Sequence, residues 1–372
     1  TVTGVQTCAL PIFTMDSPSI HPVLPPLRTD LDTSARITLA HGSGGKAMAD
    51  LIRDVFLAGF QHPCLAHLND QAVVPFPPLG ETGDRLALTT DSFVVSPLFF
   101  AGGDIGALAV NGTVNDLAVG GARPLYLTCG FILEEGLPLT TLRRVVDSMA
   151  AAAAIAGVEI VAGDTKVVPQ GSADQLFINT AGVGLVPPGL NLSPQAIQPG
   201  DVILVNGYLG DHGAAITIAR TDLVLASQIA SDCQPLNSLV QAILAVCPQV
   251  RAMRDATRGG LATVLNEFAL SADLGIVLEE ACLPVRPQVR GLCELLGLDP
   301  LYLANEGKLV VVVPASQGEA VLAAMVAHPA GRDSQIIGTT TSQSAGLVVL
   351  KTTFGSDRIV DRLVGDQLPR IC

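Results

Sequence analysis

The sequence predicts an α+β protein of two domains. Its 372 residues exceed the length at which a single hydrophobic core keeps growing, so two domains are expected. Strand-like and helix-like patterns occur in both halves without strict strand–helix alternation, which favours α+β over a doubly wound parallel sheet. Six Pro and Gly residues crowd into residues 187–200, and this density of chain breakers indicates a domain boundary.

We therefore expect a first domain over residues 34–188, a second over 189–354 and a polar tail over 355–372. Residues 1–33 are rich in Pro, Ser and Thr and show no sustained period. A short apolar patch among them lacks the basic region of a signal peptide. We expect these residues to form a disordered or non-native extension outside the fold.

The first half contains patterns typical of three helices and four strands. Apolar residues at helical spacing predict helices over 46–60, 105–119 and 140–156. Short apolar runs predict strands over 85–90, 125–133, 158–162 and 175–185. The first strand leads into Asp91, and the third ends in Gly163 and Asp164.

In the second half of the sequence, predicted strands and helices alternate less regularly than in the first. Its apolar runs predict strands over 201–206, 276–280, 308–314, 335–339 and 346–351. Helical spacing predicts helices over 211–219, 235–247, 258–271, 286–297 and 317–328. Asp211 is a candidate N-cap for the first of these helices, since Asp is among the preferred capping residues.

The composition is that of a compact, turn-rich globular enzyme. Hydrophobic residues make up 49% and charged residues 15%, and Trp is absent, so Ala, Val, Leu and Ile must form the core. The net charge of −13 argues against nucleic acid, which needs clustered Lys and Arg, but it allows nucleotides held through divalent cations. No apolar run is long enough for a membrane helix.

The eight cysteines contain no C-x-x-C pair, which removes the usual zinc and thioredoxin signatures. Scattered cysteines in a chain of this size are typical of reduced thiols, so we expect a cytoplasmic protein.

The sequence closes on Pro369, Arg370, Ile371 and Cys372. A nearby cation favours the thiolate, which is the reactive form of cysteine. Pro prevents a regular helix from continuing to the end. The alternative is a loosely ordered tail that happens to end in Cys, and these four residues alone leave both interpretations open.

Acidic residues at strand ends and on one helix form the strongest internal signal. They are Asp70, Asp91, Asp116 and Asp164. Hard oxygen ligands of this kind suit Mg²⁺, which is usually held by a few carboxylates plus substrate phosphates. Asp also caps helices and starts turns, so ordinary turn chemistry is the alternative. Asn111 and Asn115, one helical turn apart beside Asp116, add weight to the metal interpretation.

A Gly-rich segment, 42–45, precedes Lys46 and a predicted helix. Free amides at a helix start can hold an anion. The segment is not a P-loop, because Ala47 follows Lys46 where Ser or Thr is required. A tight turn without a ligand is an equal alternative.

The second half contains three polar clusters, at residues 210–213, 255–260 and 305–308. Each alone is explained by caps and turns. As a set they supply His212, Arg258 and Glu306, which are enough for phosphate charge and proton transfer.

Together these motifs resemble those of the HypE family of hydrogenase maturation proteins. The resemblance runs from about residue 37 to the last residue, and the closing tetrapeptide is its most specific part. The matching segments are His41–Gly45, Asp91, Pro97–Asp104, Gly112–Asp116, Gly163–Val167, Gly210–Gly213, Asp255–Arg258, Asn305–Lys308 and Pro369–Cys372.

The resemblance implies a two-domain fold like that of aminoimidazole ribonucleotide synthetase, with a flexible C-terminal tail. It also implies a homodimer whose N-terminal domains pair, and ATP bound near that pairing. The implied reaction is ATP-dependent dehydration of a carbamoyl group on Cys372 to a thiocyanate. HypF would supply the carbamoyl group, and a HypC–HypD complex would receive cyanide on iron for the [NiFe] site.

The resemblance also suggests roles. Cys372 is the modified residue, Glu306 and Lys166 handle protons, and His212 and Arg258 lie near the transferred phosphate. The four acids named above hold Mg²⁺, and further nucleotide contacts come from Lys46, Asn111, Asn115, Gly163 and Thr165. The alternatives are a small-molecule phosphate kinase, a selenophosphate synthetase-like enzyme or a non-catalytic maturation scaffold.

Overall fold

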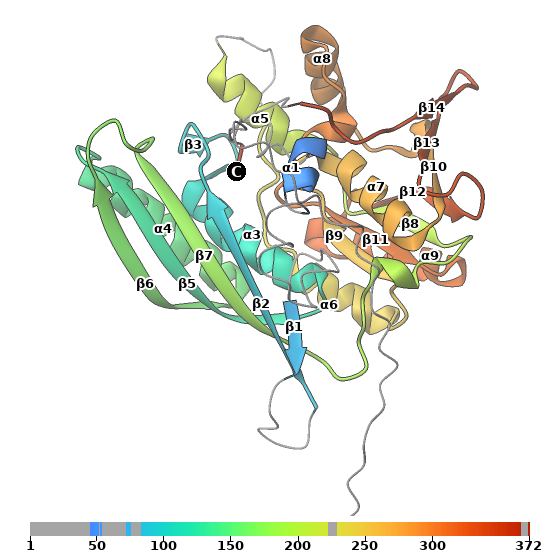
Figure 1. Ribbon diagram of the computed structural model, residues 1–372, viewed down its shortest axis with the longest axis horizontal. Coiled ribbons are helices and arrows are strands. Elements are labelled where there is room, and N and C mark those ends of the chain that lie inside the picture. The colour runs from blue at the N-terminus through green and yellow to red at the C-terminus, as the bar shows by residue number, and fades with distance from the viewer. Residues whose placement is uncertain (1–44, 52, 54–71, 76–82, 222–228, 366–370) are drawn as a thin grey trace, which may run out of the picture.

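The computed structural model describes residues 45–51, 53, 72–75, 83–221, 229–365, 371 and 372. Within these ranges two large sheets lie on either side of one helix, α3 (Ile105–Val119), as Figure 1 shows. A two-stranded ribbon of β3 (Phe99–Phe100) and β4 (Gly103–Asp104) leads into α3, and α1 (Lys46–Leu51) precedes the first sheet.

The first sheet has five strands in the order β1-β2-β7-β5-β6. Their bounds are Ala72–Pro75, Arg85–Phe93, Leu176–Val186, Arg123–Glu134 and Glu159–Val168. All neighbours are antiparallel except β5 and β6, whose parallel pairing requires a crossover, and α4 (Leu139–Ala156) supplies it. Side chains on one face pack against α3 and α4, whereas alternate side chains face away from both helices.

The second sheet has seven strands in the order β14-β13-β10-β12-β8-β11-β9. Their bounds are Asp357–Ile359, Val348–Lys351, Gly275–Glu279, Gln335–Thr341, Val202–Val205, Leu309–Val313 and Ala252–Asp255. All five residues of β11, Leu-Val-Val-Val-Val, are buried, as expected for a strand covered on both faces. The helices of this half are α5 (Asp211–Arg220), α6 (Asn237–Val246), α7 (Gly260–Ala272), α8 (Pro287–Leu296) and α9 (Gly318–Ala327).

Helix α3 belongs to the cores of both halves. Thirteen of its 15 residues are buried. Its N-terminal half packs with α4 and the first sheet, and Ala118 and Val119 pack against α6 and the second sheet. Asp104 caps it by accepting hydrogen bonds from the amides of Gly106 and Ala107, at 2.8 and 3.0 Å. A helix buried on all sides positions whatever polar residues it carries at the junction of the two domains.

The α+β class and the two-domain architecture are confirmed, and every predicted element with described residues is present. The helix predicted over 46–60 is described only to Leu51 and at residue 53. The bounds assigned to the domains stay a prediction. Residues 1–33 lie outside the described residues.

Three local predictions are wrong. Strand β6 does not end at Gly163–Asp164 but pairs with β5 as far as Val168. Asp211 is the first residue of α5, and the cap is Gly210, whose φ of 83° is the left-handed conformation that glycine adopts easily. Part of the predicted polar tail forms β14, which pairs with β13. Strand β9, with four residues, was not predicted at all.

None of the helices within the described ranges has the length and apolar character needed to cross a membrane.

The close approach of α3 to α4 depends on Gly106. A Cβ at this position would lie 2.4 Å from the carbonyl oxygen of Val145, which is backbone and cannot move aside cheaply. Gly106→Ala should therefore lower the free energy of unfolding by about 1–3 kcal/mol. Gly291 in α8 is the matched control, since nothing lies within 4 Å of its added Cβ. Gly291→Ala should stabilise by about 0.5–1 kcal/mol through helix propensity. Thermal melting of both variants tests this, and equal melting temperatures would contradict it.

Candidate active site

The last two residues of the chain are inserted between the two domains. Cys372 is only 8% exposed, and it packs with Ile371 in the core that includes Phe93 and Ala304. The amide of Val94, directly after β2, donates to a main-chain oxygen of Cys372 at 2.9 Å. The end of the chain is therefore held by backbone pairing with the first domain. In Figure 1 the C-terminus lies beside β2 and β3, near α5.

Arg258 binds the sulfur of Cys372. Its Nε and one terminal nitrogen donate to Sγ at 3.2 and 2.9 Å. Arg258 sits between β9 and α7, directly before Gly259 and Gly260, which have φ of 78° and 60°. A Cβ on Gly260 would lie 2.5 Å from the carbonyl oxygen of Leu301, so this pair of glycines lets α7 begin close to its neighbour.

The inserted sulfur is a neutral thiol. Burial raises the pKa of Cys372 to about 12, and Arg258 only partly opposes this shift. The carboxyl groups of Glu306 and Asp91 raise the pKa further. The expectation that a nearby cation makes this cysteine a thiolate is therefore wrong for the inserted state. Arg370, the cation of that expectation, lies outside the described residues.

Glu306 is a buried carboxyl group beside the thiol. It is 3% exposed, and its Oε1 has no hydrogen-bond partner among the described residues. Burial raises its pKa well above the ordinary value, the charges of Asp232, Asp255 and Asp91 add to this, and Arg258 opposes it. A carboxyl group with a raised pKa in a closed site is typical of a proton acceptor that works near neutral pH.

His212, in the first turn of α5, holds the inserted backbone. Its Nε2 lies 2.6 Å from the carbonyl oxygen of Ile371, and its Nδ1 lies 2.8 Å from Oγ of Ser231. A carbonyl only accepts, so Nε2 carries the proton and the hydroxyl of Ser231 donates to Nδ1. Burial lowers the pKa of His212, which favours this neutral form. Its described hydrogen bonds go to the protein, and a contact with phosphate stays a prediction.

Asp91, on β2, and Asp116, on α3, both lie in the layer between the first sheet and α3. Asp91 accepts from the amide of Ser92 at 2.7 Å, and burial raises its pKa while Arg258 opposes the rise. Asp116, on α3, accepts from Oγ1 of Thr89 at 3.0 Å. These two acids therefore face the same layer between sheet and helix.

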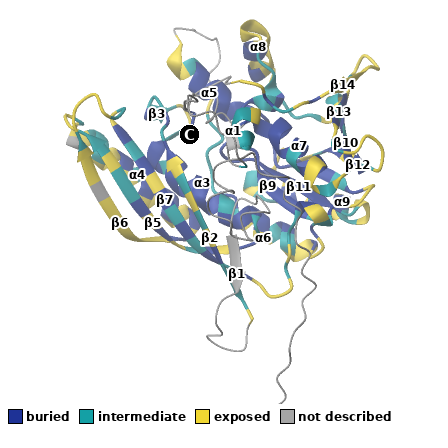
Figure 2. Ribbon diagram, viewed as in Figure 1, coloured by how far each residue is buried: buried dark blue, intermediate teal, exposed yellow. Residues whose placement is uncertain are grey.

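Asp164 and Lys166 lie elsewhere, on the exposed edge strand β6 (Figure 2). They form an ion pair of 2.7 Å with each other. Asp164 and Ser92, the neighbour of Asp91, lie in one row across the sheet three strand spacings apart, or about 14 Å.

Of the predicted metal ligands that the structure describes, Asp91 and Asp116 lie near one another, whereas Asp164 lies apart from both. Among the described residues no three or more His, Cys, Asp and Glu side chains converge as a metal site would require. Asp70, the fourth acid, lies outside the described residues. Asp91 and Asp116 remain together, and Asp164 does not join them.

The asparagines of α3 bind a segment of the second half. Nδ2 of Asn111 donates to Sγ of Cys233 at 3.4 Å. Asn115 donates to the carbonyl of Gln234 at 3.1 Å and accepts from the amide of Leu236 at 2.7 Å. Their buried amides thus join the domains. Oδ1 of Asn111 has no described partner.

The remaining predicted nucleotide contacts are scattered. Gly163 lies in β6, where a Cβ would be 2.6 Å from the carbonyl oxygen of Cys129, so it serves close strand packing. Lys46 begins α1, and its amide donates to the carbonyl of Leu363 at 3.1 Å. Thr165 is also in β6, and its side chain lies outside what the structure describes, as do residues 42–44.

The sequence did not point to Asp232. This buried carboxylate accepts from the amides of Glu306 and Gly307, at 3.0 and 3.2 Å, and from Nζ of Lys308 at 3.0 Å. It lies on the segment 231–234, which also carries Ser231. No motif marks this segment, and only its contact with residues 305–308 reveals it.

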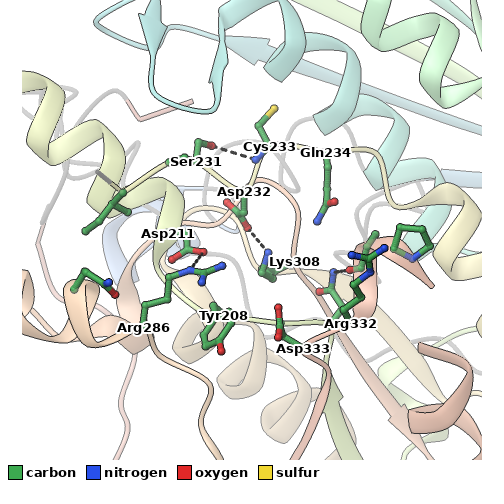
Figure 3. A pocket seen from close by; sticks show the side chains of 17 residues that line it. Tyr208, Asp211, Ser231, Asp232, Cys233, Gln234, Arg286, Lys308, Arg332 and Asp333 are labelled. Carbon is green, nitrogen blue, oxygen red and sulfur yellow. Dashed lines mark hydrogen bonds and ion pairs between the residues drawn. The ribbon is translucent and has the colours of Figure 1, made fainter. Parts of the chain in front are cut away.

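A cavity of about 480 Å³ lies on the other side of this segment (Figure 3). Asp232, Lys308 and Cys233 line it, together with a second ion pair, Asp211–Arg286, whose atoms are 3.0 Å apart and in which Asp211 is buried and Arg286 is partly exposed. Tyr208 packs under the guanidinium of Arg286 at 4.0 Å. The segment therefore separates this cavity from the inserted end of the chain.

Two family models match the chain. Residues 68–186 match the N-terminal domain of AIR synthase related proteins, and residues 198–351 match their C-terminal domain. A curated relative from Rhodobacter capsulatus, named carbamoyl dehydratase HypE, is 57% identical over 337 residues, which cover 91% of this chain and 98% of that protein. The chain belongs to the HypE family.

Solved structures of HypE proteins share the fold. A HypE–HypF complex aligns with a TM-score of 0.79 at 47% identity, covering 84% of this chain and 99% of that one. A HypE in complex with ATP aligns with a TM-score of 0.75 at 47% identity, covering 91% of this chain and all of that one.

The buried carboxyl of Glu306 makes stability depend on pH. Its folded pKa lies well above the ordinary 4.5, so between these two values the unfolded chain has lost a proton that the folded chain keeps. The stability contributed by Glu306 therefore falls as pH rises through that window, by about 1.4 kcal/mol per pH unit. Glu306→Gln cannot titrate and should gain thermal stability relative to the parent between pH 5 and 8. Parallel melting-temperature curves across this range would refute the assignment.

Proposed function

We propose that this HypE family member is an ATP-dependent carbamoyl dehydratase that acts on its own Cys372, converting an S-carbamoyl group to a thiocyanate for [NiFe] hydrogenase maturation. The observation that carries the proposal is the burial of Cys372, whose sulfur is bound by Arg258 and whose pKa is raised in part by the buried carboxyl of Glu306. The relative named carbamoyl dehydratase shares more than half of this sequence. A dehydratase needs this combination of a held sulfur and a proton acceptor in a closed site.

The chemistry divides into two bond changes. The carbamoyl oxygen takes the γ-phosphoryl group of ATP, and its bond to carbon then breaks with phosphate as the leaving group. Nitrogen loses two protons as the carbon–nitrogen triple bond forms. One proton ends on phosphate and one is released. Glu306 would accept a proton from nitrogen, while two N–H groups of Arg258 hold the sulfur in place.

Mg²⁺ would accompany ATP. Mg²⁺ in such sites is usually bound by one or two carboxylates plus phosphate oxygens, so Asp91 and Asp116 would be sufficient without Asp164. Asp91 lies on β2, three residues before Val94, whose amide contacts Cys372, and Asp116 lies on α3, where it accepts from Thr89 of the same strand.

Carbamoylation of Cys372 requires the C-terminal tail to leave its buried position between the two domains. A buried thiol with a pKa of about 12 has almost no thiolate at neutral pH and no access to a donor protein. We propose HypF as the carbamoyl donor to the released tail, in line with the HypE–HypF complex among the structural relatives. A HypC–HypD complex would then receive the cyanide. We expect this to take place in the cytoplasm.

We propose a homodimer formed through the open face of the first sheet. Tyr126 and Ile132 on β5 are 45% and 44% exposed on the face turned away from α3 and α4. Lys166 pairs in register with Ile132, so it lies at this same face. A proton-handling role for Lys166 would then be exercised across the dimer, because in one protomer the edge strand lies far from Cys372.

Intact-mass measurement tests the reaction. Incubation with HypF, carbamoyl phosphate and ATP should add about 43 mass units at Cys372 and then remove about 18 in a step that requires ATP. The Glu306→Gln variant should still be carbamoylated, but it should fail to lose water in the ATP-dependent step. Cys372→Ser should show neither, whereas Cys282→Ser, which removes an exposed free thiol, should show both. If Cys372→Ser keeps consuming ATP at the parent rate on a small substrate, the protein is a kinase and the proposal is wrong.

Sedimentation velocity tests the dimer. Ile132→Glu places a charge on the open face of the sheet and should give monomers. Ile155→Glu is the matched control, because Ile155 is 75% exposed on α4, on the opposite side of the sheet, and should stay dimeric. A dimeric Ile132→Glu protein with parental affinity would exclude this interface.

A further inference from the structure

Residues 231–234, here called the bridging segment, contact both domains. The amide of Ser231 donates to the carbonyl of Ala101 at 2.7 Å. A Cβ on Gly102 would lie 2.5 Å from the carbonyl oxygen of Ser231. A Cβ on Gly307 would lie 2.0 Å from the carbonyl oxygen of Asp232. Any side chain at either glycine would push the segment away, so its position is fixed tightly by backbone on both sides.

One end of the bridging segment holds the inserted tail. Ser231 donates to His212, and His212 donates to the carbonyl of Ile371, the residue before the reactive cysteine. The position of the sulfur is thus linked to Ser231 through two short hydrogen bonds.

The next residue holds the proton acceptor. The side chain of Asp232 is buried, at 4% exposed, and it accepts from the backbone amide of Glu306, while its second oxygen accepts from Gly307 and Lys308. The ion pair with Lys308 and the amide of Glu306 lower its pKa despite burial, so it is a carboxylate. Three donors on one buried carboxylate leave it little freedom to move.

We propose that Asp232 is a positioning residue for the dehydration step, which sets the carboxyl of Glu306 against the tail that the adjacent Ser231 holds. The inference rests on the proposed function and extends it to a residue outside the reacting groups. The reacting carboxyl and the reacting sulfur are then supported by neighbouring residues of one segment. A displacement of about 1 Å in such a pair costs up to about 100-fold in rate.

The charge of Asp232 has a second effect that a purely structural residue lacks. It is the largest charge contribution to the raised pKa of Glu306, ahead of Asp255 and Asp91, and Arg258 acts in the opposite sense. Removing it lowers the pKa of Glu306. Since Glu306 must be ionised to accept a proton, the acid limb of the rate against pH should move to lower pH.

The test measures the ATP-dependent loss of about 18 mass units from pre-carbamoylated protein across pH 5–9. Asp232→Asn should slow this step by about 10- to 100-fold and shift its acid limb downward, with the carbamoylation step unchanged. Asp232→Asn alone leaves Lys308 buried and unpaired, which threatens folding. The double variant Asp232→Asn/Lys308→Met removes the pair at similar volume, and it should fold and show the same slowing.

The matched control is Asp211→Asn/Arg286→Met. It removes another ion pair from the wall of the same cavity, one without a hydrogen bond to Glu306 (Figure 3). It should keep both the rate and the pH profile of the parent. If the double Asp232 variant folds and dehydrates within twofold of the parent with an unmoved acid limb, the proposal is overturned.

Glu306→Gln in the same assay separates the two levels of inference. If that variant dehydrates at the parent rate, the proposed role of Glu306 as proton acceptor is wrong, and the positioning role of Asp232 is wrong as well. If it is inactive while the Asp232 variants are unaffected, the role of Asp232 alone is wrong.

Discussion

The site depends on desolvation at the junction of the two domains. The thiol of Cys372, the carboxyl of Glu306 and the guanidinium of Arg258 are brought together where little water reaches, and burial is the largest cause of the pKa shift of both Cys372 and Glu306. An ionised group in such surroundings needs a partner, so Arg258 and Asp232 stay charged through close contacts while the other two take up protons. The carboxyl of Glu306 must lose its own proton before it can accept one from nitrogen, and its raised pKa makes the ionised form a stronger base than an ordinary carboxylate.

Helix α3 creates this junction. Because it is buried on every side, its asparagines cannot reach solvent. Asn111 binds the sulfur of Cys233, and Asn115 binds the backbone of Gln234 and Leu236, at the end of the bridging segment and just beyond it. The polar spacing that pointed to a nucleotide contact has a described role in joining the domains, and the nucleotide contact stays a prediction. The same geometry puts the bridging segment, the 305–308 turn and the end of the chain around one site, although they are 60 or more residues apart in sequence.

Local sequence pattern was sufficient to predict features that depend on neighbouring residues, such as helix bounds and short motifs. The helix predicted over 105–119 has the bounds of α3, and the motif residues His212, Arg258, Glu306 and Cys372 all meet. Sequence pattern gave wrong predictions where strand pairing sets the end of an element or where burial sets the protonation state of a side chain. Asp164 looked like a strand-end ligand, but β6 is extended by its pairing with β5. Cys372 looked like a thiolate because Arg370 is near in sequence, whereas enclosure by both domains sets its protonation. Asp232 has no signal because its partners are more than 70 residues away.

Under the proposed reaction the inserted tail cannot be too stable. The contacts of Val94, His212 and Arg258 favour insertion, and the donor protein binds only the fraction of molecules whose tail is out, so each tenfold excess of the inserted state weakens loading about tenfold. Two of these contacts go to main-chain oxygens and are the same before and after loading. The contact of Arg258 with Sγ is the one that the cargo changes, because carbamoylation replaces the thiol proton with an amide. Arg258 is therefore where loaded and unloaded tails can be told apart, and its interaction with the cargo decides which of them stays inserted.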